Sequence, residues 1–146
     1  MDGEKGTHAE LKALREGCGL SQVEVAKAAD TGQRSIARWE STDERYDAPK
    51  RVWRYLREVE RTQDEQVKYC VDAAKEQAKA LGDPTVVALT YYQSQEQYDE
   101  FGRDEGPVGW ANAVARKTAA ELRRLGFEVE FRYPNEGAIP TPGSRY

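Results

Sequence analysis

Two arginines and a glutamine lie close together within residues 33–38. At helical spacing, Gln33, Arg34 and Arg38 share the polar side of one short helix. The edge of guanine in the major groove accepts two parallel hydrogen bonds from a guanidinium group, and a glutamine amide pairs with adenine in the same way. A helix that exposes these three side chains therefore has the chemistry to read base edges in duplex DNA.

The surrounding residues, 21–40, predict the elements that position this helix. The sequence SQVEVAKAADTGQRSIARWE is typical of two short helices joined by a tight turn. Ser21, with Glu24 three residues later, forms a capping box that starts the first helix. Ile36 and Trp39 are three residues apart and are expected to face inward, opposite the arginines. The alternative is an ordinary helical hairpin whose arginine side is only solvated.

The predicted turn between the two helices is Asp30-Thr31-Gly32. Asp30 or Thr31 is expected to cap the second helix, and Gly32 to take a strained turn conformation. The whole segment resembles the lambda-repressor/Cro (XRE-type) helix-turn-helix, with one departure. That family usually has glycine where this chain has Asp30, which tolerates the left-handed conformation. The residues that carry the resemblance are Gln22, Val25, Ala26, Ala29, Gly32 and Ile36.

Further candidate contacts follow the second helix. The resemblance implies that the polar loop after Glu40 and the start of the next helix, at Pro49, touch phosphates, which position a protein without reading sequence. Gln22 is expected to hold a phosphate at the start of its helix. The complete set of candidate DNA-binding residues is Gln22, Gln33, Arg34, Ser35, Arg38, Arg45, Lys50 and Arg51.

The charge of the chain argues against a general nucleic-acid coat. The 146 residues carry a net charge of −4 at pH 7, and the isoelectric point is near 5.2. A protein that binds phosphates is expected to carry a basic surface. Residues 8–57 contain ten Lys and Arg against eight Asp and Glu, a net charge of +2. We therefore expect site-specific binding with weak non-specific affinity.

The sequence offers little for catalysis, and we expect no enzyme activity, cofactor or metal. His8 is the single histidine, so neither a histidine metal site nor a nucleophile with a histidine base can be assembled. Cys18 and Cys70 form no CxxC motif, and a disulfide between them is the less favoured alternative to reduced thiols. The polar N-terminus and the absence of a long apolar run predict a cytoplasmic protein without a signal peptide or membrane span.

The rest of the chain predicts a mainly α fold with a small β component (α+β). Thr7 and Glu10 start a helix that ends at Gly17. Apolar residues recur at a helical period from residue 52 to residue 81, although Thr62 with Glu65 could start a second helix there. We expect a helix-turn-helix domain in residues 1–60, a helix-strand-helix-strand dimerisation domain in residues 61–133 and a Pro/Gly-rich tail in residues 134–146.

The C-terminal third contains two predicted strands, residues 85–92 and 127–133. Between them, a capping box of Ser94 and Gln97 starts a short helix with Tyr98 and Phe101 inward, and a longer helix begins at Pro107. A lone pair of strands is marginal in water, so either pairing across a dimer or coverage by the helices must stabilise it. The tail is expected to lack regular structure, or else to lie along the body or a partner.

At this level the chain is also similar to the YdiL-like regulators, which include the anti-CRISPR-associated (Aca) repressors of phages. The similarity rests on Arg34-Ser35 leading to Trp39-Glu40-Ser41, on the helix that starts at Pro49, on the strand, and on Gly109-Trp110 opening a late helix. It implies a phage or bacterial homodimer that represses a nearby promoter through an inverted repeat, with Gln33, Arg34 and Arg38 on the reading helix.

Two other functions remain open at the level of sequence. An antitoxin or phage inhibitor that binds a protein, with the helix-turn-helix as scaffold only, is favoured by the acidic balance. A regulator that responds to a small molecule is the third possibility, because the C-terminal aromatics could line a pocket, although core packing explains them equally well.

Overall fold

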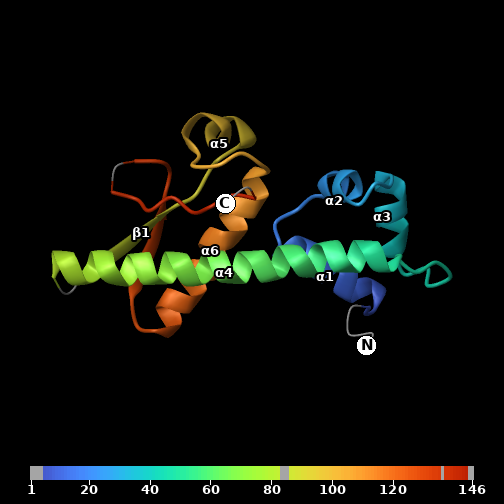
Figure 1. The fold of residues 1–146 in the computed structure, drawn as a ribbon, viewed down its shortest axis with the longest axis horizontal. Coiled ribbons are helices and arrows are strands. Elements are labelled where there is room, and N and C mark those ends of the chain that lie inside the picture. Colours follow the sequence, from blue (N-terminus) through green and yellow to red (C-terminus); the bar gives the residue numbers. More distant parts are fainter. Residues whose placement is uncertain (1–4, 83–85, 136, 145–146) are drawn as a thin grey trace. The chain divides into compact units, whose positions relative to one another are not determined.

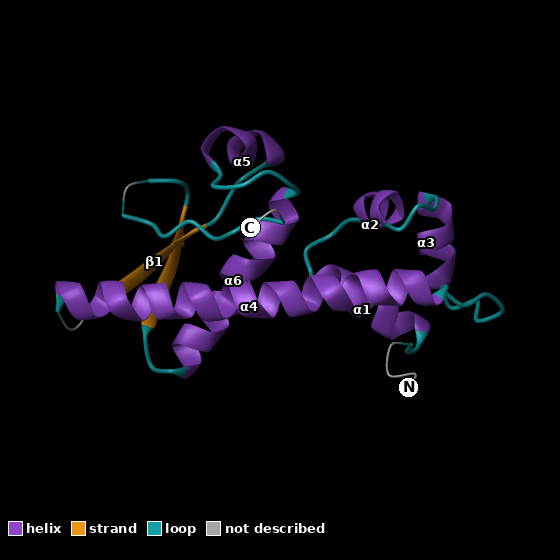
Figure 2. Ribbon diagram, viewed as in Figure 1, coloured by secondary structure: helices purple, strands orange, loops and turns teal. Residues whose placement is uncertain are grey.

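The computed structural model of the chain describes residues 5–82, 86–135 and 137–144 (Figure 1). The chain divides into two compact units between Thr62 and Gln63, the N-terminal unit of residues 1–62 and the C-terminal unit of residues 63–146. Helices predominate and the strands are few (Figure 2), so the predicted mainly α fold with a small β component is confirmed.

The N-terminal unit contains α1 (His8–Gly17), α2 (Gln22–Ala28), α3 (Gln33–Trp39) and the first part of α4 (Lys50–Leu81). The two predicted capping boxes, Thr7 with Glu10 and Ser21 with Glu24, are both present. The apolar sides of the helices are buried, and Trp53, 2% exposed, lies among these core residues. The fully buried core side chains are Leu11, Val25, Ile36, Val52 and Leu56.

The turn between α2 and α3 agrees with the prediction at Asp30 and differs from it at Gly32 and in the cap of α3. Asp30, with φ at 54°, takes the left-handed conformation. Gly32 is the N-cap of α3 with an extended backbone (φ −93°, ψ 155°), and no side chain caps this helix. The prediction that Gly32 takes the strained position and that Asp30 or Thr31 caps α3 is therefore wrong. The reason is that α2 ends at Ala28 with Ala29 as its C-cap, so the left-handed conformation falls on the next residue, Asp30.

A single helix, α4, spans residues 50–81, so Thr62 and Glu65 lie inside it and start no second helix. Its buried side chains follow the predicted helical stripe through both units, and the stripe ends before Leu81, which is 68% exposed. The buried residues of this stripe are Val52, Leu56, Val59, Gln63, Cys70 and Ala74.

The C-terminal unit is built around two parallel strands, β1 (Val86–Thr90) and β2 (Glu128–Arg132). Between them in sequence come α5 (Gln95–Phe101) and α6 (Val108–Arg124). Residues of α4, β1 and α6 form the core: Val71, Ala74, Val87, Leu89, Ala119 and Leu122. Both predicted strands are present, although Thr85 lies outside the described residues.

The short helix α5 buries one aromatic side chain and not the two predicted. Tyr98 is 1% exposed and packs edge-to-face on Tyr92, with ring centroids 4.8 Å apart. Phe101 is 56% exposed, so its predicted inward position is wrong. Tyr98 packs in a cluster with Tyr92 and Ala111, and Val108 lies against this cluster. Tyr98 is the one aromatic residue of α5 in the cluster.

The described part of the tail packs along the body, one of the predicted alternatives, and forms no helix or strand of its own. Ile139 pairs with Leu89 in a parallel bridge, and its N–H and C=O bond to Ala88 and Thr90 of β1 at 2.9 Å. The Thr141 hydroxyl is fully buried and donates to the Ala111 carbonyl at 2.8 Å. β1 is thus hydrogen-bonded on both edges within one chain, by β2 and by the tail. The two strands are therefore stabilised within one chain. Pairing across a dimer, one of the two predicted alternatives, is not needed for this.

Candidate nucleic-acid interface

The side chains of α3 separate into a buried side and a solvent side. Ile36 is 1% exposed and anchors the helix, while Trp39 is partly buried. Gln33, Arg34 and Arg38 are exposed on the other side. Among the residues that the structure describes, neither arginine forms an ion pair. The predicted separation of anchor and arginines is therefore present, and both guanidinium groups remain available for a ligand.

A chain of hydrogen bonds connects the core to this solvent side. The Arg15 guanidinium binds both carboxylate oxygens of Glu40, with Nε at 2.6 Å and Nη2 at 2.9 Å. Gln22 donates from Nε2 to the same carboxylate at 3.1 Å. Gln33 then donates from Nε2 to Gln22 Oε1 at 2.6 Å. The hydrogen bonds thus hold the side chain of Gln33, at the start of α3, to Gln22 and through it to the buried Glu40–Arg15 pair.

Glu40 is the acceptor on which this chain of bonds depends. Its side chain is 3% exposed and that of Arg15 is 10% exposed. The Glu40 hydrogen bond raises the pKa of the Arg15 guanidinium, which further favours its charged form. Sequence analysis missed this pair, because Arg15 and Glu40 are 25 positions apart and carry no local signal. It did find Gln22, but the structure uses the Gln22 amide to link Glu40 to Gln33.

The loop between α3 and α4 carries a cation that is already partnered. Arg45 pairs with Asp43 at 2.8 Å, and this contact lowers the pKa of the Asp43 carboxyl. The Tyr46 ring lies close to two guanidinium groups, 5.1 Å from that of Arg38 and 5.6 Å from that of Arg45. Cations over an aromatic face are attracted to it. Tyr46 therefore brings the loop and the arginine side of α3 together.

Two of the three remaining candidate residues lie at the start of α4. Lys50 is exposed, and Arg51 donates from Nε to the Ala29 carbonyl at 3.0 Å, at the end of α2. Arg51 therefore joins α4 to α2. Ser35, the last candidate, is partly buried on α3. Seven of the eight candidates thus lie on α3, on the loop that follows it or at the start of α4, and the eighth, Gln22, is in direct contact with Gln33.

Residues 11–44 match the family model described as helix-turn-helix. This segment resembles an XRE-type helix-turn-helix. It spans most of α1, all of α2 and α3, and the beginning of the following loop, so the match covers the bond chain from Arg15 to Gln33. The predicted XRE-type resemblance is confirmed for this segment, and the similarity of the longer chain to YdiL-like regulators stays a prediction. A search of curated proteins finds no match to the chain.

A histidine at the edge of the XRE-type helix-turn-helix was not anticipated either. His8 contacts the Ser41 carbonyl through Nδ1 at 3.0 Å and the Asp47 carboxylate through Nε2 at 3.2 Å. Both partners are acceptors, so the ring satisfies both only when each nitrogen carries a proton. These contacts raise the His8 pKa, the Asp47 contact most. His8 therefore ties the start of α1 to the loop that carries Tyr46.

The helix-turn-helix match supports a DNA-binding regulator of the XRE type. Within the described ranges, no cluster of three or more His, Cys, Asp or Glu side chains is placed to hold a metal ion. None of the helices in those ranges combines the length and apolar character that crossing a membrane requires. Cys18 and Cys70 are both buried and not joined by a disulfide.

Proposed function

We propose that this chain is a dimeric transcriptional repressor, of phage or bacterial origin, which binds an inverted-repeat operator through α3. The observation that carries the proposal is the solvent-facing pair Arg34 and Arg38, without ion-pair partners among the described residues, inside a segment that matches the helix-turn-helix family. The second helix of such a motif enters the major groove. A protein bound there blocks access of polymerase to an overlapping promoter.

The reading residues have distinct roles in this proposal. Arg34 or Arg38 placed bidentate on guanine discriminates against other bases by about 1–3 kcal/mol. Gln33 uses one amide hydrogen on Gln22. A second amide hydrogen and the carbonyl oxygen remain, which is the set that adenine N7 and N6 require. The Gln22 contact therefore orients Gln33 for adenine without consuming that set.

The proposed phosphate contacts are Ser35, Arg45, Lys50 and Arg51, with Gln22 at the start of α2. Arg45 shares its charge with Asp43 at 2.8 Å, and Arg51 is bonded to Ala29. Contacts of this kind position a protein on DNA and make its affinity fall with salt. Since the chain carries a net charge of −4, these contacts supply only weak binding to DNA in general.

A dimer follows from the size of the reading element. α3 has seven residues, so one copy reaches only a few base pairs. Two copies related by a two-fold axis present their reading helices to major grooves about 34 Å apart, which matches a palindromic site. Doubling the contacts offsets the small basic surface of each copy.

The test measures binding of the purified full chain to the DNA upstream of its own gene by fluorescence anisotropy. We expect the double variant Arg34→Ala/Arg38→Ala to lose affinity by about 100-fold or more, because two base contacts are removed. The control is Lys75→Ala/Lys79→Ala, which removes the same charge from exposed positions of α4 outside the helix-turn-helix. Undiminished binding by the arginine variant contradicts the assignment of the reading residues.

The second candidate function is a protein-interaction module, such as an antitoxin or phage inhibitor. The acidic balance of the chain is the observation that favours it. If the wild-type chain binds neither its upstream DNA nor a randomised duplex library at low salt, this candidate replaces the repressor.

A further inference from the structure

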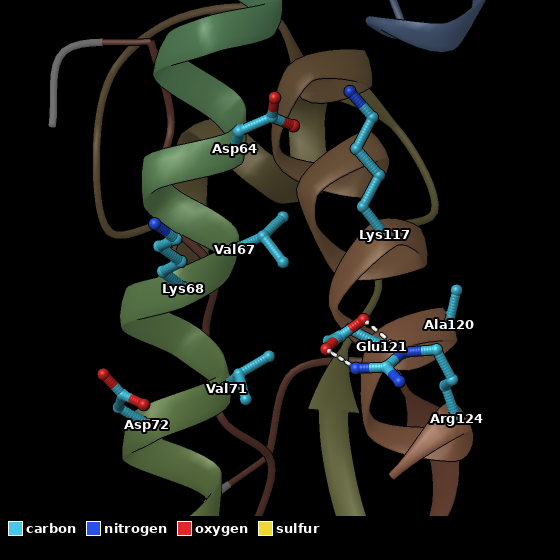
Figure 3. Close-up of a pocket in the computed structure, with 9 residues that line it drawn as sticks. All are labelled: Asp64, Val67, Lys68, Val71, Asp72, Lys117, Ala120, Glu121 and Arg124. Carbon is cyan, nitrogen blue, oxygen red and sulfur yellow. Dashed lines mark hydrogen bonds and ion pairs between the residues drawn. The ribbon is translucent and has the colours of Figure 1, made fainter.

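The C-terminal unit contains an open groove between α4 and α6. Its volume is about 700 Å³. Figure 3 shows Val67 and Val71 pointing from α4 toward α6, and Ala120 lies on the opposite helix. These three side chains provide a narrow apolar strip. The strip alone buries too little area to hold a partner firmly, so the charges along its two sides decide what fits.

Each side of the groove carries a row of three charged residues whose signs alternate. Where the row on α4 is negative, the row on α6 is positive, and the reverse. The row on α4 is Asp64, Lys68 and Asp72, negative, positive, negative. The row on α6 is Lys117, Glu121 and Arg124, positive, negative, positive. The order of signs in each row is the same in both directions. The α4 row can therefore place opposite charges against an α6 row that runs either parallel or antiparallel to it.

The pairing inside one chain leaves the α4 row unused. Glu121 pairs with Arg124 on α6 at 2.6 Å, and Lys117 donates to Gln63 Oε1 at 2.8 Å. Asp64, Lys68 and Asp72 are exposed and form no ion pair with any residue that the structure describes. The groove therefore presents three unpaired charges whose complement exists on its own opposite side.

We propose that the α4/α6 groove is the surface through which two copies of this chain associate, α4 of each copy lying against α6 of the other. This inference rests on the proposed dimeric repressor and names its interface. A two-fold axis requires that both complementary rows lie on the same surface of one chain, as they do here. Association of α4 with α4 in antiparallel register instead sets Lys68 against its own copy and Asp64 against Asp72, which repel.

The balance of charge selects a second copy over other occupants. The rim holds three acidic and three basic residues, so it favours neither an anionic nor a cationic small molecule. A peptide with a single charge sign meets like charges in each of the two rows. A second copy of the chain meets attraction along both rows.

The test is sedimentation velocity of the full chain without DNA, over a range of concentrations. We expect a reversible dimer. Lys68→Glu and Glu121→Lys, each alone, are expected to weaken the dimer about tenfold or more, because each places like charges opposite one another. The combined variant Lys68→Glu/Glu121→Lys restores the opposite signs and is expected to recover most of the wild-type association. The control Lys79→Glu, exposed on α4 but outside the groove, is expected to leave association unchanged.

Circular dichroism of each variant shows whether it is folded. If either single variant is not folded, Asp64→Lys with Arg124→Glu provides a second exchange at the same groove. A wild-type chain that stays monomeric, or a dimer that neither reversal weakens, overturns the inference. The anisotropy test of Arg34 and Arg38 does not depend on this result, so failure of the interface is distinguishable from failure of the DNA-binding proposal.

Discussion

At the scale of single residues, Glu40 holds the reading surface to the core. It accepts hydrogen bonds from both Arg15 and Gln22, and its carboxylate is almost fully buried. Removing one partner of a buried ion pair leaves the other charge desolvated without compensation, which costs far more than an exposed pair contributes. The stability of the N-terminal unit and the orientation of Gln33 therefore depend on the same side chain.

We predict that Glu40→Ala lowers the free energy of unfolding by about 3 kcal/mol, because it leaves the Arg15 charge buried and unpaired. Urea denaturation followed by circular dichroism measures this change. Glu16→Ala, which removes an exposed acid from α1, is the matched control and is expected to have little effect. A loss for Glu40→Ala no larger than that of Glu16→Ala contradicts the role given to this pair.

His8 gives the N-terminal unit a stability that depends on pH. Its pKa is raised above the ordinary value, first by Asp47 and then by the Ser41 carbonyl, while burial opposes the shift. Glu44 adds a smaller favourable field, and Lys5 lies in the same pocket as His8 and Asp47. A raised folded-state pKa means that the protonated ring stabilises the fold. This contribution is complete below the unfolded-state pKa, about 6.5, and is lost as pH rises through the higher folded-state pKa.

We therefore predict that the stability advantage of the wild type over His8→Gln is larger at pH 5.5 than at pH 8.5, values that lie about one to two units either side of the unfolded-state pKa. Urea denaturation at the two pH values measures the difference. An advantage that is equal at both values, or larger at the higher pH, contradicts the protonated state assigned to His8.

At the scale of elements, the turn between α2 and α3 sets the direction of the reading helix. Asp30 bears the left-handed conformation, while the backbone of Gly32 is one that any residue adopts. A Cβ added at Gly32 meets no atom within 4 Å. The glycine of this turn is thus replaceable, and the aspartate is the position under conformational constraint.

We predict that Asp30→Val lowers the free energy of unfolding by about 1–2 kcal/mol, since a β-branched residue is strained at positive φ, whereas Asp30→Gly does not lower it. Gly32→Ser is expected to be neutral or to stabilise by a few tenths of a kcal/mol, because serine is a better N-cap. Thermal unfolding of the three variants tests the turn. Greater sensitivity at Gly32 than at Asp30 contradicts this assignment.

At the scale of the whole molecule, the tail completes the C-terminal unit. Gln66, 4% exposed, donates to the Gly143 carbonyl at 2.9 Å and accepts from the Trp110 indole at 2.8 Å. These two hydrogen bonds join α4 to the tail and to α6, and the bridge between Ile139 and β1 joins the tail to the sheet. The tail is therefore structural, although its Pro/Gly-rich composition is typical of a linker.

We predict that a chain shortened to end at Asn135 exchanges the amide hydrogens of β1 faster, with the local opening free energy lower by about 2 kcal/mol or more, because Thr90 loses its acceptor on Ile139. Hydrogen exchange with mass spectrometry measures β1, and α1 in the other unit serves as the internal reference. A chain that ends at Gly143 keeps Ile139 and Thr141 and is the matched control. Unchanged exchange of β1 in the shorter chain contradicts a structural tail.

The sequence by itself determined what depends on near neighbours. The capping boxes at Thr7 and Ser21 join residues three positions apart, and the inward position of Ile36 follows from helical periodicity. The presence of the helices, the two strands and the exposed arginines of α3 were therefore predictable. The strained conformation predicted for Gly32 and the cap predicted for Asp30 or Thr31 were wrong, because the exact end of a helix lies below what local pattern resolves.

Only the tertiary structure decided the contacts between residues far apart in the chain. Arg15 meets Glu40, His8 meets Asp47 and Ile139 meets Leu89, and in each case a charged, polar or apolar residue has many equivalent partners in the sequence. Which partner is met depends on how the helices and strands pack, since packing alone brings their surfaces together. The arginine side of α3 was visible in the sequence, whereas the buried carboxylate that orients it became visible only in the fold.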